Sequence, residues 1–241
     1  MIGIFDSGIG GVTVLKELIK KMPQEKYIYY SDSKNCPYGD KSTEELKSIV
    51  SEVIVYLINK GCNTIIIACN TASTLSEYLR EKFDVLIIAI EPAYKMVYDY
   101  AYDKKTLVLA TKRTIESEKF KTLFEKYDNH KTIIHSCSGL ADLIEKGNNE
   151  EIDEYLKNNL SQFVGVECVV LGCTHYPLIK ENIRKVLGDV IFFDGSLGVS
   201  NRTYDLLSKS NLLVGNNGSV QFFDSSYDLT KKNRFFEILY N

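Results

Sequence analysis

Short runs of apolar residues alternate along the chain with longer stretches in which apolar and polar residues recur at helical spacing. Continuous apolar runs of this length are typical of strands buried on both faces, as in parallel sheets. The runs predict strands at residues 2–5, 27–30, 64–67, 85–90, 106–109, 132–135, 167–171, 190–193 and 219–223. Helices are predicted between them at residues 12–22, 42–60, 74–83, 93–102, 115–127, 139–146, 150–164, 178–187, 196–208 and 229–240. This alternation predicts an α/β fold with mainly parallel sheets.

One local arrangement occurs twice. The strand at 64–67 leads to Cys69, and the strand at 167–171 leads to Cys173, with a helix after each cysteine. Ligands bind at the carboxyl ends of strands in open α/β sheets, and a helix N-terminus favours a thiolate. The repeat predicts two three-layer α/β domains that contribute to one site. We expect residues 1–93 plus 203–241 to form the domain with Cys69, and residues 94–202 to form the domain with Cys173.

Composition narrows the class of protein. The 241 residues carry a net charge of −3, which argues against nucleic acid or an acidic membrane as a partner. No apolar run is long enough for a membrane helix. The first residues enter a strand at once, and the six cysteines are scattered, so we expect no signal peptide and reduced thiols in the cytoplasm.

The glycine-rich segment after the first strand is a poor nucleotide-binding loop. It runs from Asp6 to Gly11, and the spacing G-x-G-x-x-G would need a glycine where Thr13 stands. The carboxylate of Asp6 at its start would also repel a phosphate. We therefore expect no dinucleotide cofactor.

The two repeated cysteines leave several chemistries open. A disulfide is disfavoured by the reducing compartment, and zinc held by Cys69, Cys173 and His175 lacks any C-x-x-C pair in support. A Cys–His nucleophile would leave one cysteine without a role. Simple packing of both as small apolar residues is the plainest alternative. The remaining alternative gives both cysteines a role, one as acid and the other as base on opposite faces of one carbon. Such a pair would invert a stereocentre.

Six short segments stand out as motifs: residues 5–11 (FDSGIGG), 37–39 (PYG), 68–73 (ACNTAS), 91–92 (EP), 110–114 (ATKRT) and 172–177 (GCTHYP). These segments resemble the motifs of the glutamate racemases. Together they span most of the chain. In four places the sequence departs from the family pattern: at residues 31–33 (SDS), at residues 137–140 (CSGL), in the short segment between residues 145 and 167, and in the C-terminal tail.

The resemblance implies an isomerase without cofactor or metal, which racemises glutamate in a cleft between two pseudo-symmetric domains. It implies that Cys69 and Cys173 are the two bases, assisted by Asp6 and His175 respectively. The substrate would be held by a set of mostly small polar residues: Asp6, Ser7, Tyr38, Gly39, Asn70, Thr71, Thr111, Thr114, Thr174 and His175. Glu145 matches a further acidic position of the family. The product D-glutamate would supply peptidoglycan synthesis.

Other functions stay open at this point. An aspartate racemase shares the logic of two cysteines, and so does any amino-acid racemase of this type. A thiol-based redox or metal protein and an amino-acid-binding protein without catalysis are the other classes. The expected partner is the small-molecule substrate, with no nucleic acid and no membrane, and a homodimer is the one assembly left open.

Overall fold

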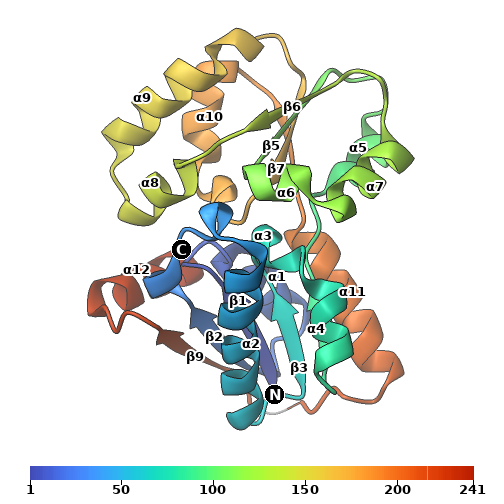
Figure 1. The fold of residues 1–241 in the computed structure, drawn as a ribbon, viewed down its shortest axis with the longest axis vertical. Coiled ribbons are helices and arrows are strands. Elements are labelled where there is room, and N and C mark those ends of the chain that lie inside the picture. The colour runs from blue at the N-terminus through green and yellow to red at the C-terminus, as the bar shows by residue number, and fades with distance from the viewer. Residues whose placement is uncertain (216) are drawn as a thin grey trace. The chain divides into compact units, whose positions relative to one another are not determined.

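The computed structural model describes residues 1–215 and 217–241. The chain forms two compact units, residues 1–90 with 196–241 and residues 91–195 (Figure 1). The domain limits expected from the sequence, at residues 93 and 202, stay a prediction. No helix among the described residues is both long and apolar enough to cross a membrane.

The first unit is built on a parallel sheet of five strands. Its strand order is β4-β3-β1-β2-β9, so the first strand of the chain is central and the last is at the edge. The strands are β1 (Ile2–Asp6), β2 (Lys26–Ser31), β3 (Thr64–Ile67), β4 (Leu86–Ala89) and β9 (Ser219–Asp224). Every residue of β1 and β3 is buried, which explains their unbroken apolar character.

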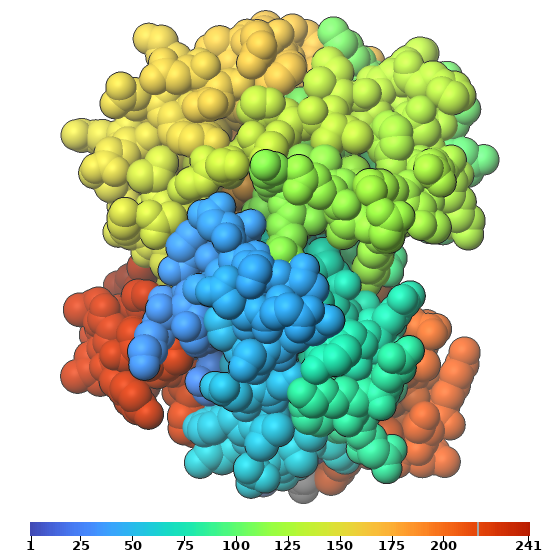
Figure 2. Space-filling view, viewed as in Figure 1, coloured from blue at the N-terminus to red at the C-terminus, as the bar shows by residue number. Residues whose placement is uncertain are grey.

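Helices cover both faces of this sheet. One face packs against α1 (Val12–Lys21), α11 (Ser196–Lys209) and α12 (Leu229–Tyr240), and the other against α2 (Thr43–Asn59), α3 (Asn70–Ser73) and α4 (Ser76–Lys82). The α2 and α4 segments lie side by side on the surface of this unit (Figure 2). Lys82 of α4 donates a hydrogen bond to Ser51 of α2. The first unit is therefore a three-layer α/β sandwich.

The second unit has a parallel sheet of four strands in the order β6-β5-β7-β8. The strands are β5 (Thr106–Ala110), β6 (Thr132–Ser136), β7 (Cys168–Gly172) and β8 (Ile191–Asp194). Buried clusters on both faces join the sheet to its helices. These are α5 (Tyr94–Tyr100), α6 (Lys112–Glu116), α7 (Glu118–Tyr127), α8 (Leu140–Lys146), α9 (Asn149–Leu160) and α10 (Lys180–Leu187).

The two units share one topology. The order β4-β3-β1-β2 in the first unit becomes β8-β7-β5-β6 in the second when each strand is replaced by its counterpart four strands later in the chain. β9 extends the first sheet beyond this common plan. The α/β class, the parallel sheets and the internal repeat expected from the sequence are thus confirmed.

Two predicted helices differ in detail from the structure. The helix predicted at 74–83 is α4, which begins at Ser76, and the separate short helix α3 precedes it; Thr74 and Leu75 lie between the two, where the Thr74 hydroxyl donates to the carbonyl of Thr71 (2.7 Å). The helix expected at 115–127 is interrupted at Ser117, whose Oγ accepts from the N–H of Phe120 (3.2 Å) and starts α7. In both cases a hydroxyl bonds to nearby backbone and competes with the continuous helix.

Candidate active site

Cys69 and Cys173 occupy equivalent positions in the two units. Cys69 lies two residues beyond Ile67, the partner of Phe5 in the central strand β1. Cys173 lies two residues beyond Leu171, which pairs in the same way with Leu109 of the central strand β5. Cys69 therefore follows β3, the neighbour of β1, and Cys173 follows β7, the equivalent neighbour of β5. Both lie at the carboxyl edge of a parallel sheet, where α/β proteins bind ligands.

The sulfur of Cys69 is held at the start of α3. Cys69 is 5% exposed, and its Sγ accepts from the backbone N–H of Ala72 at 3.5 Å. The thiol also donates to the hydroxyl of Ser7 at 3.6 Å. A backbone donor aimed at the sulfur favours negative charge on it, so this environment suits a thiol that gives and takes a proton.

Asp6 is a fully buried carboxylate at the end of β1. Its Oδ1 accepts from the N–H of Gly8 at 3.0 Å, which shapes the turn that carries Ser7. Gly11 closes this turn, and a Cβ there would lie 2.9 Å from the Cβ of Asp6. The glycine-rich segment thus allows close packing around Asp6, in place of the phosphate cradle that its sequence superficially suggests.

Tyr38 and Gly39 belong to a 3-10 helix, Tyr38–Asp40, that contacts α3. The Tyr38 ring is 2% exposed and shares a buried cluster with Cys69 and Ala72. Its hydroxyl donates to Oδ2 of Asp32 at 2.6 Å. Burial raises the pKa of Tyr38 well above its ordinary value, and the negative groups Asp32, Cys69 and Asp6 add to this, so Tyr38 stays neutral and acts as a donor.

Asn70 and Thr71 form the first turn of α3 and are 6% and 3% exposed. The side-chain oxygen of Asn70 is buried and accepts no hydrogen bond from any residue that the structure describes. A buried acceptor of this kind is costly unless a partner reaches it. It is therefore a candidate contact for a donor group of a bound molecule.

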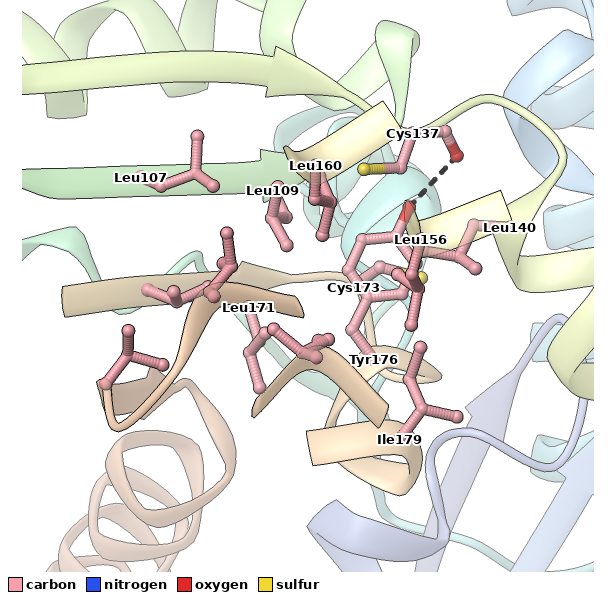
Figure 3. Close-up of a cluster of buried hydrophobic side chains, with 14 of the residues drawn as sticks. Leu107, Leu109, Cys137, Leu140, Leu156, Leu160, Leu171, Cys173, Tyr176 and Ile179 are labelled. Carbon is pink, nitrogen blue, oxygen red and sulfur yellow. Dashed lines mark hydrogen bonds between the residues drawn. The ribbon is translucent and has the colours of Figure 1, made fainter. Parts of the chain in front are cut away.

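In the second unit, Cys173 is paired with a buried histidine. Cys173 is 8% exposed, and its Sγ lies 3.9 Å from Nδ1 of His175. Figure 3 places Cys173 beside Tyr176, whose hydroxyl donates to the carbonyl of Cys137 at 3.2 Å and so fixes the chain that follows the cysteine. Cys173 also belongs to a buried apolar cluster that includes Leu140 and Leu156.

His175 connects Cys173 to Glu145 of α8. The Nε2 atom of His175 is 2.7 Å from Oε2 of Glu145, and the two side chains are 1% and 6% exposed. Burial by itself lowers the pKa of His175, but the hydrogen bonds with Cys173 and Glu145 outweigh it and hold the pKa well above its ordinary value. A protonated imidazole donates from both nitrogens, to the carboxylate on one side and toward the sulfur on the other.

The expected threonines also lie at the carboxyl edge of the second sheet. Thr111 follows β5, and its hydroxyl lies 2.9 Å from that of Thr114 and accepts from the Thr114 N–H at 3.2 Å. Thr114 and Thr174 are 2% and 3% exposed. Since Ala110 pairs with Gly172, Thr111 and Cys173 follow neighbouring strands.

The structure thus gathers the predicted residues into one set in each unit. The first set comprises Asp6, Ser7, Tyr38, Gly39, Cys69, Asn70 and Thr71, and the second comprises Thr111, Thr114, Glu145, Cys173, Thr174 and His175. The residue that sequence reasoning missed is Asp32, although its position directly after a predicted strand was a usable signal. No disulfide joins any two of the six cysteines, and the described residues contain no group of three or more His, Cys, Asp or Glu side chains placed to hold a metal ion.

Comparison with known proteins agrees with this picture. Residues 6–197 match the family described as Asp/Glu/Hydantoin racemase. The glutamate racemase of Clostridium perfringens strain SM101 is 40% identical over 237 residues, which cover 94% of this chain and 91% of that protein. The glutamate racemase of Clostridium botulinum strain Alaska E43 is 41% identical, with 93% and 91% covered.

Solved structures give the same result. Glutamate racemase isoform RacE1 from Bacillus anthracis has a TM-score of 0.87 at 28% identity, covering 99% of this chain and 93% of that one. The Francisella tularensis glutamate racemase, solved in complex with D-glutamate, has a TM-score of 0.82 at 31% identity, with 100% and 93% covered. An aspartate racemase from Picrophilus torridus, at 19% identity and a TM-score of 0.59, shares the fold. The chain therefore belongs to the glutamate racemases of the Asp/Glu/Hydantoin racemase family.

Proposed function

We propose that this protein interconverts L- and D-glutamate by moving one proton at the α-carbon, with Cys69 and Cys173 as the two bases. The observation that carries the proposal is the placement of both thiols at equivalent strand ends of two units with one topology. A single base returns a proton to the face from which it came. Inversion is simplest with two groups that act on opposite faces.

The reaction requires no redox change. The thiolate of one cysteine takes the α-proton, so that an S–H bond forms as the C–H bond breaks and the electron pair stays on the α-carbon. The thiol of the other cysteine then gives its proton to the opposite face and becomes the thiolate. One proton has entered and one has left, and the reverse reaction uses the same groups in the opposite roles.

Each cysteine has its own assisting groups in this proposal. Asp6 and Ser7 assist Cys69, whose sulfur is in contact with the Ser7 hydroxyl. His175 assists Cys173, and Glu145 keeps the imidazole protonated and oriented. An imidazolium beside a sulfur stabilises a thiolate, so the pair prepares this side for proton abstraction.

The substrate is held mainly by neutral donors and acceptors. We assign this role to Ser7, Tyr38, Gly39, Asn70, Thr71, Thr111, Thr114 and Thr174, together with Asp6 and His175. The buried oxygen of Asn70 suits a donor such as the substrate ammonium. Neutral donors near the α-carboxylate would stabilise the charge that develops on it as the proton leaves.

The relatives support glutamate as the substrate. The Francisella tularensis protein was solved with D-glutamate, and the Escherichia coli glutamate racemase with L-glutamate. We extend this substrate to the present chain, with D-glutamate supplied to peptidoglycan in the cytoplasm. Six cysteines without a disulfide fit a reducing compartment.

The test follows optical rotation and deuterium incorporation together. Purified protein, treated with chelator, is incubated in D₂O with L-glutamate and separately with D-glutamate. We expect both solutions to reach the racemate with deuterium at the α-carbon. Cys69→Ser and Cys173→Ser should each slow this by about 10²-fold or more, because a serine hydroxyl is a far poorer acid and base at neutral pH.

Cys168→Ser is the matched control, since Cys168 is fully buried at the start of β7 and has no proposed role. It should racemise glutamate as the wild type does. If the wild type leaves both enantiomers unchanged and free of deuterium, the assignment to glutamate is wrong, and aspartate is the next substrate to try. If either single variant keeps the wild-type rate, the two-thiol mechanism is wrong.

A further inference from the structure

Asp32 is a buried carboxylate beside the proposed site that no part of the proposed chemistry uses. It follows β2 directly and is 1% exposed. Its two oxygens accept from the amide nitrogen of Asn35 at 3.1 and 3.0 Å, and Oδ2 also accepts from the hydroxyl of Tyr38 at 2.6 Å. Among the described residues it forms no ion pair. A buried carboxylate without a cation is expensive, so its hydrogen bonds have to be well made.

The position of Asp32 connects two segments of the Cys69 set. Its backbone N–H donates to the carbonyl of Asp6 at 2.9 Å, which continues the pairing of β1 with β2 by one more bond. Its side chain holds Tyr38, whose ring packs in one cluster with Cys69. Asp32 thus bonds directly to Asp6 and Tyr38, and Tyr38 belongs to the same buried cluster as Cys69.

The loop that follows Asp32 is secured in two places. Its start is tied to the end of β9, where Ser33 donates to Asp224 and the Lys34 N–H donates to Ser225 at 2.9 Å. Further along, the Tyr38 hydroxyl reaches back to Asp32. Since Gly39 is the next residue, the backbone of the Tyr38–Gly39 segment is set by where the Tyr38 side chain is held.

The second unit provides an instructive comparison. Cys137 follows β6 as Asp32 follows β2, and its carbonyl accepts from the hydroxyl of Tyr176 at 3.2 Å. In each unit, therefore, the residue directly after the second strand accepts a hydrogen bond from a tyrosine hydroxyl. The first unit uses a carboxylate for the purpose, and hydrogen bonds to a charged acceptor are shorter and stronger than those to a neutral one.

We propose that Asp32 is a positioning residue of the racemase reaction, which fixes Tyr38 and through it the substrate contacts of the Tyr38–Gly39 segment next to Cys69. This inference rests on the proposed function and goes beyond it in naming what holds the substrate loop. Asp32 does not touch the reacting carbon and exchanges no proton with it. Its effect is on binding of both enantiomers.

The test compares Asp32→Asn, Tyr38→Phe and the double variant. In Asp32→Asn the volume is kept, but the Tyr38 hydroxyl meets a neutral acceptor in place of a charged one, and the other oxygen becomes an amide donor that faces the amide of Asn35. We expect KM for L- and for D-glutamate to rise about tenfold or more, the factor that corresponds to one lost hydrogen bond to a charged group. The ratio of kcat in the two directions should stay as in the wild type.

The double variant separates this role from an unrelated loss of stability. Because Asp32→Asn weakens and Tyr38→Phe removes the same hydrogen bond, the double variant should have a KM no higher than the worse single variant. Tyr38→Phe keeps the ring and its packing, so it also tests the proposal if Asp32→Asn fails to fold.

The second unit contains a matched pair for control. The hydroxyl of the fully buried Tyr94 donates to Oδ1 of Asp128 at 3.0 Å. This is also a bond from a buried tyrosine to an aspartate, but neither residue has a proposed role in the site. Tyr94→Phe should lower Tm and leave KM unchanged.

The outcomes are distinct. If the wild type racemises glutamate and Asp32→Asn keeps the wild-type KM, the positioning role is wrong and the proposed function stands. The role is equally wrong if KM in Asp32→Asn rises no more than in Tyr94→Phe. If the wild type does not racemise glutamate, both the function and this inference are overturned.

Discussion

The substitution Glu145→Gln tests the electrostatic reasoning on the Cys173 side. Glu145 is 9% exposed, and its carboxylate lies 2.7 Å from Nε2 of a histidine that is 1% exposed. Burial lowers the pKa of His175, and the pKa is nevertheless raised well above 6.5 because hydrogen bonds with Cys173 and Glu145 prevail. A glutamine keeps the shape and can still accept a hydrogen bond, but it removes the charge that keeps the proton on His175.

The size of the effect depends on pH. In the unfolded chain His175 has a pKa near about 6.5, and folding raises it. The pair therefore contributes fully to stability below that value, and the contribution is lost as the pH rises through the folded pKa. Within this window one proton is bound on folding, so stability falls by up to about 1.4 kcal/mol per pH unit. Loss of one partner of a buried ion pair costs about 3–5 kcal/mol, and we take about 3 kcal/mol near pH 6 because glutamine retains one hydrogen bond.

The assay is urea unfolding of wild type and Glu145→Gln at several pH values between 6 and 9. We expect the difference in free energy of unfolding to be largest at pH 6 and to shrink steadily toward pH 9. Comparison with the variant cancels the titration of all other groups. The exposed Asp142, which pairs with Lys146 on the same helix, supplies the control, and Asp142→Asn should barely change stability at any pH.

Two results would refute this reasoning. Parallel stability curves for wild type and Glu145→Gln would mean that His175 does not bind an extra proton on folding. A variant as active as the wild type, with the same dependence of rate on pH, would mean that the charge of Glu145 is not transmitted to Cys173.

Two further substitutions test the packing of each unit. Gly11→Ala would place a Cβ 2.7 Å from the hydroxyl of Tyr29 and 2.9 Å from the Cβ of Asp6, so we expect a loss of about 1–3 kcal/mol in thermal unfolding and slower racemisation. Gly198→Ala, with nothing within 4 Å of its Cβ, is the control and should stabilise the protein, and equal behaviour of the two would contradict the packing. Asn129→Ala removes four hydrogen bonds that a 4% exposed side chain makes within the second unit, and urea unfolding should show a loss of about 3 kcal/mol. A loss below about 1 kcal/mol would show that water replaces these bonds.

The secondary structure was largely predictable because its signals are local. The apolar run Thr64–Ile67 is a fully buried strand, as its composition required. The helix predicted at 42–60 begins with a capping box, in which Ser42 Oγ accepts from the Glu45 N–H and the Glu45 carboxylate accepts from the Ser42 N–H. The separate helix α3 before Thr74 and the break at Ser117 were not predicted, because a hydroxyl that bonds to nearby backbone leaves the apolar periodicity unchanged.

The candidate site was predictable in part. Cys69 and Cys173 could be selected from the repeat of strand, cysteine and helix, since position at a strand end follows from the chain itself. The family motifs supplied the polar residues around them. The roles assigned to these residues stay predictions until the cysteine variants are assayed.

The amino-acid sequence by itself determined the alternation of strands and helices, the parallel class of the sheets and the two cysteines at strand ends. Tertiary structure decided which strands pair, including the common order of the two sheets and the place of β9 beside β2. It also decided the pairing of His175 with Glu145, thirty residues apart, and the bond from Tyr38 to Asp32. The physical reason is that periodicity records only which face of an element is buried. Contacts between distant residues depend on the register in which the elements pack.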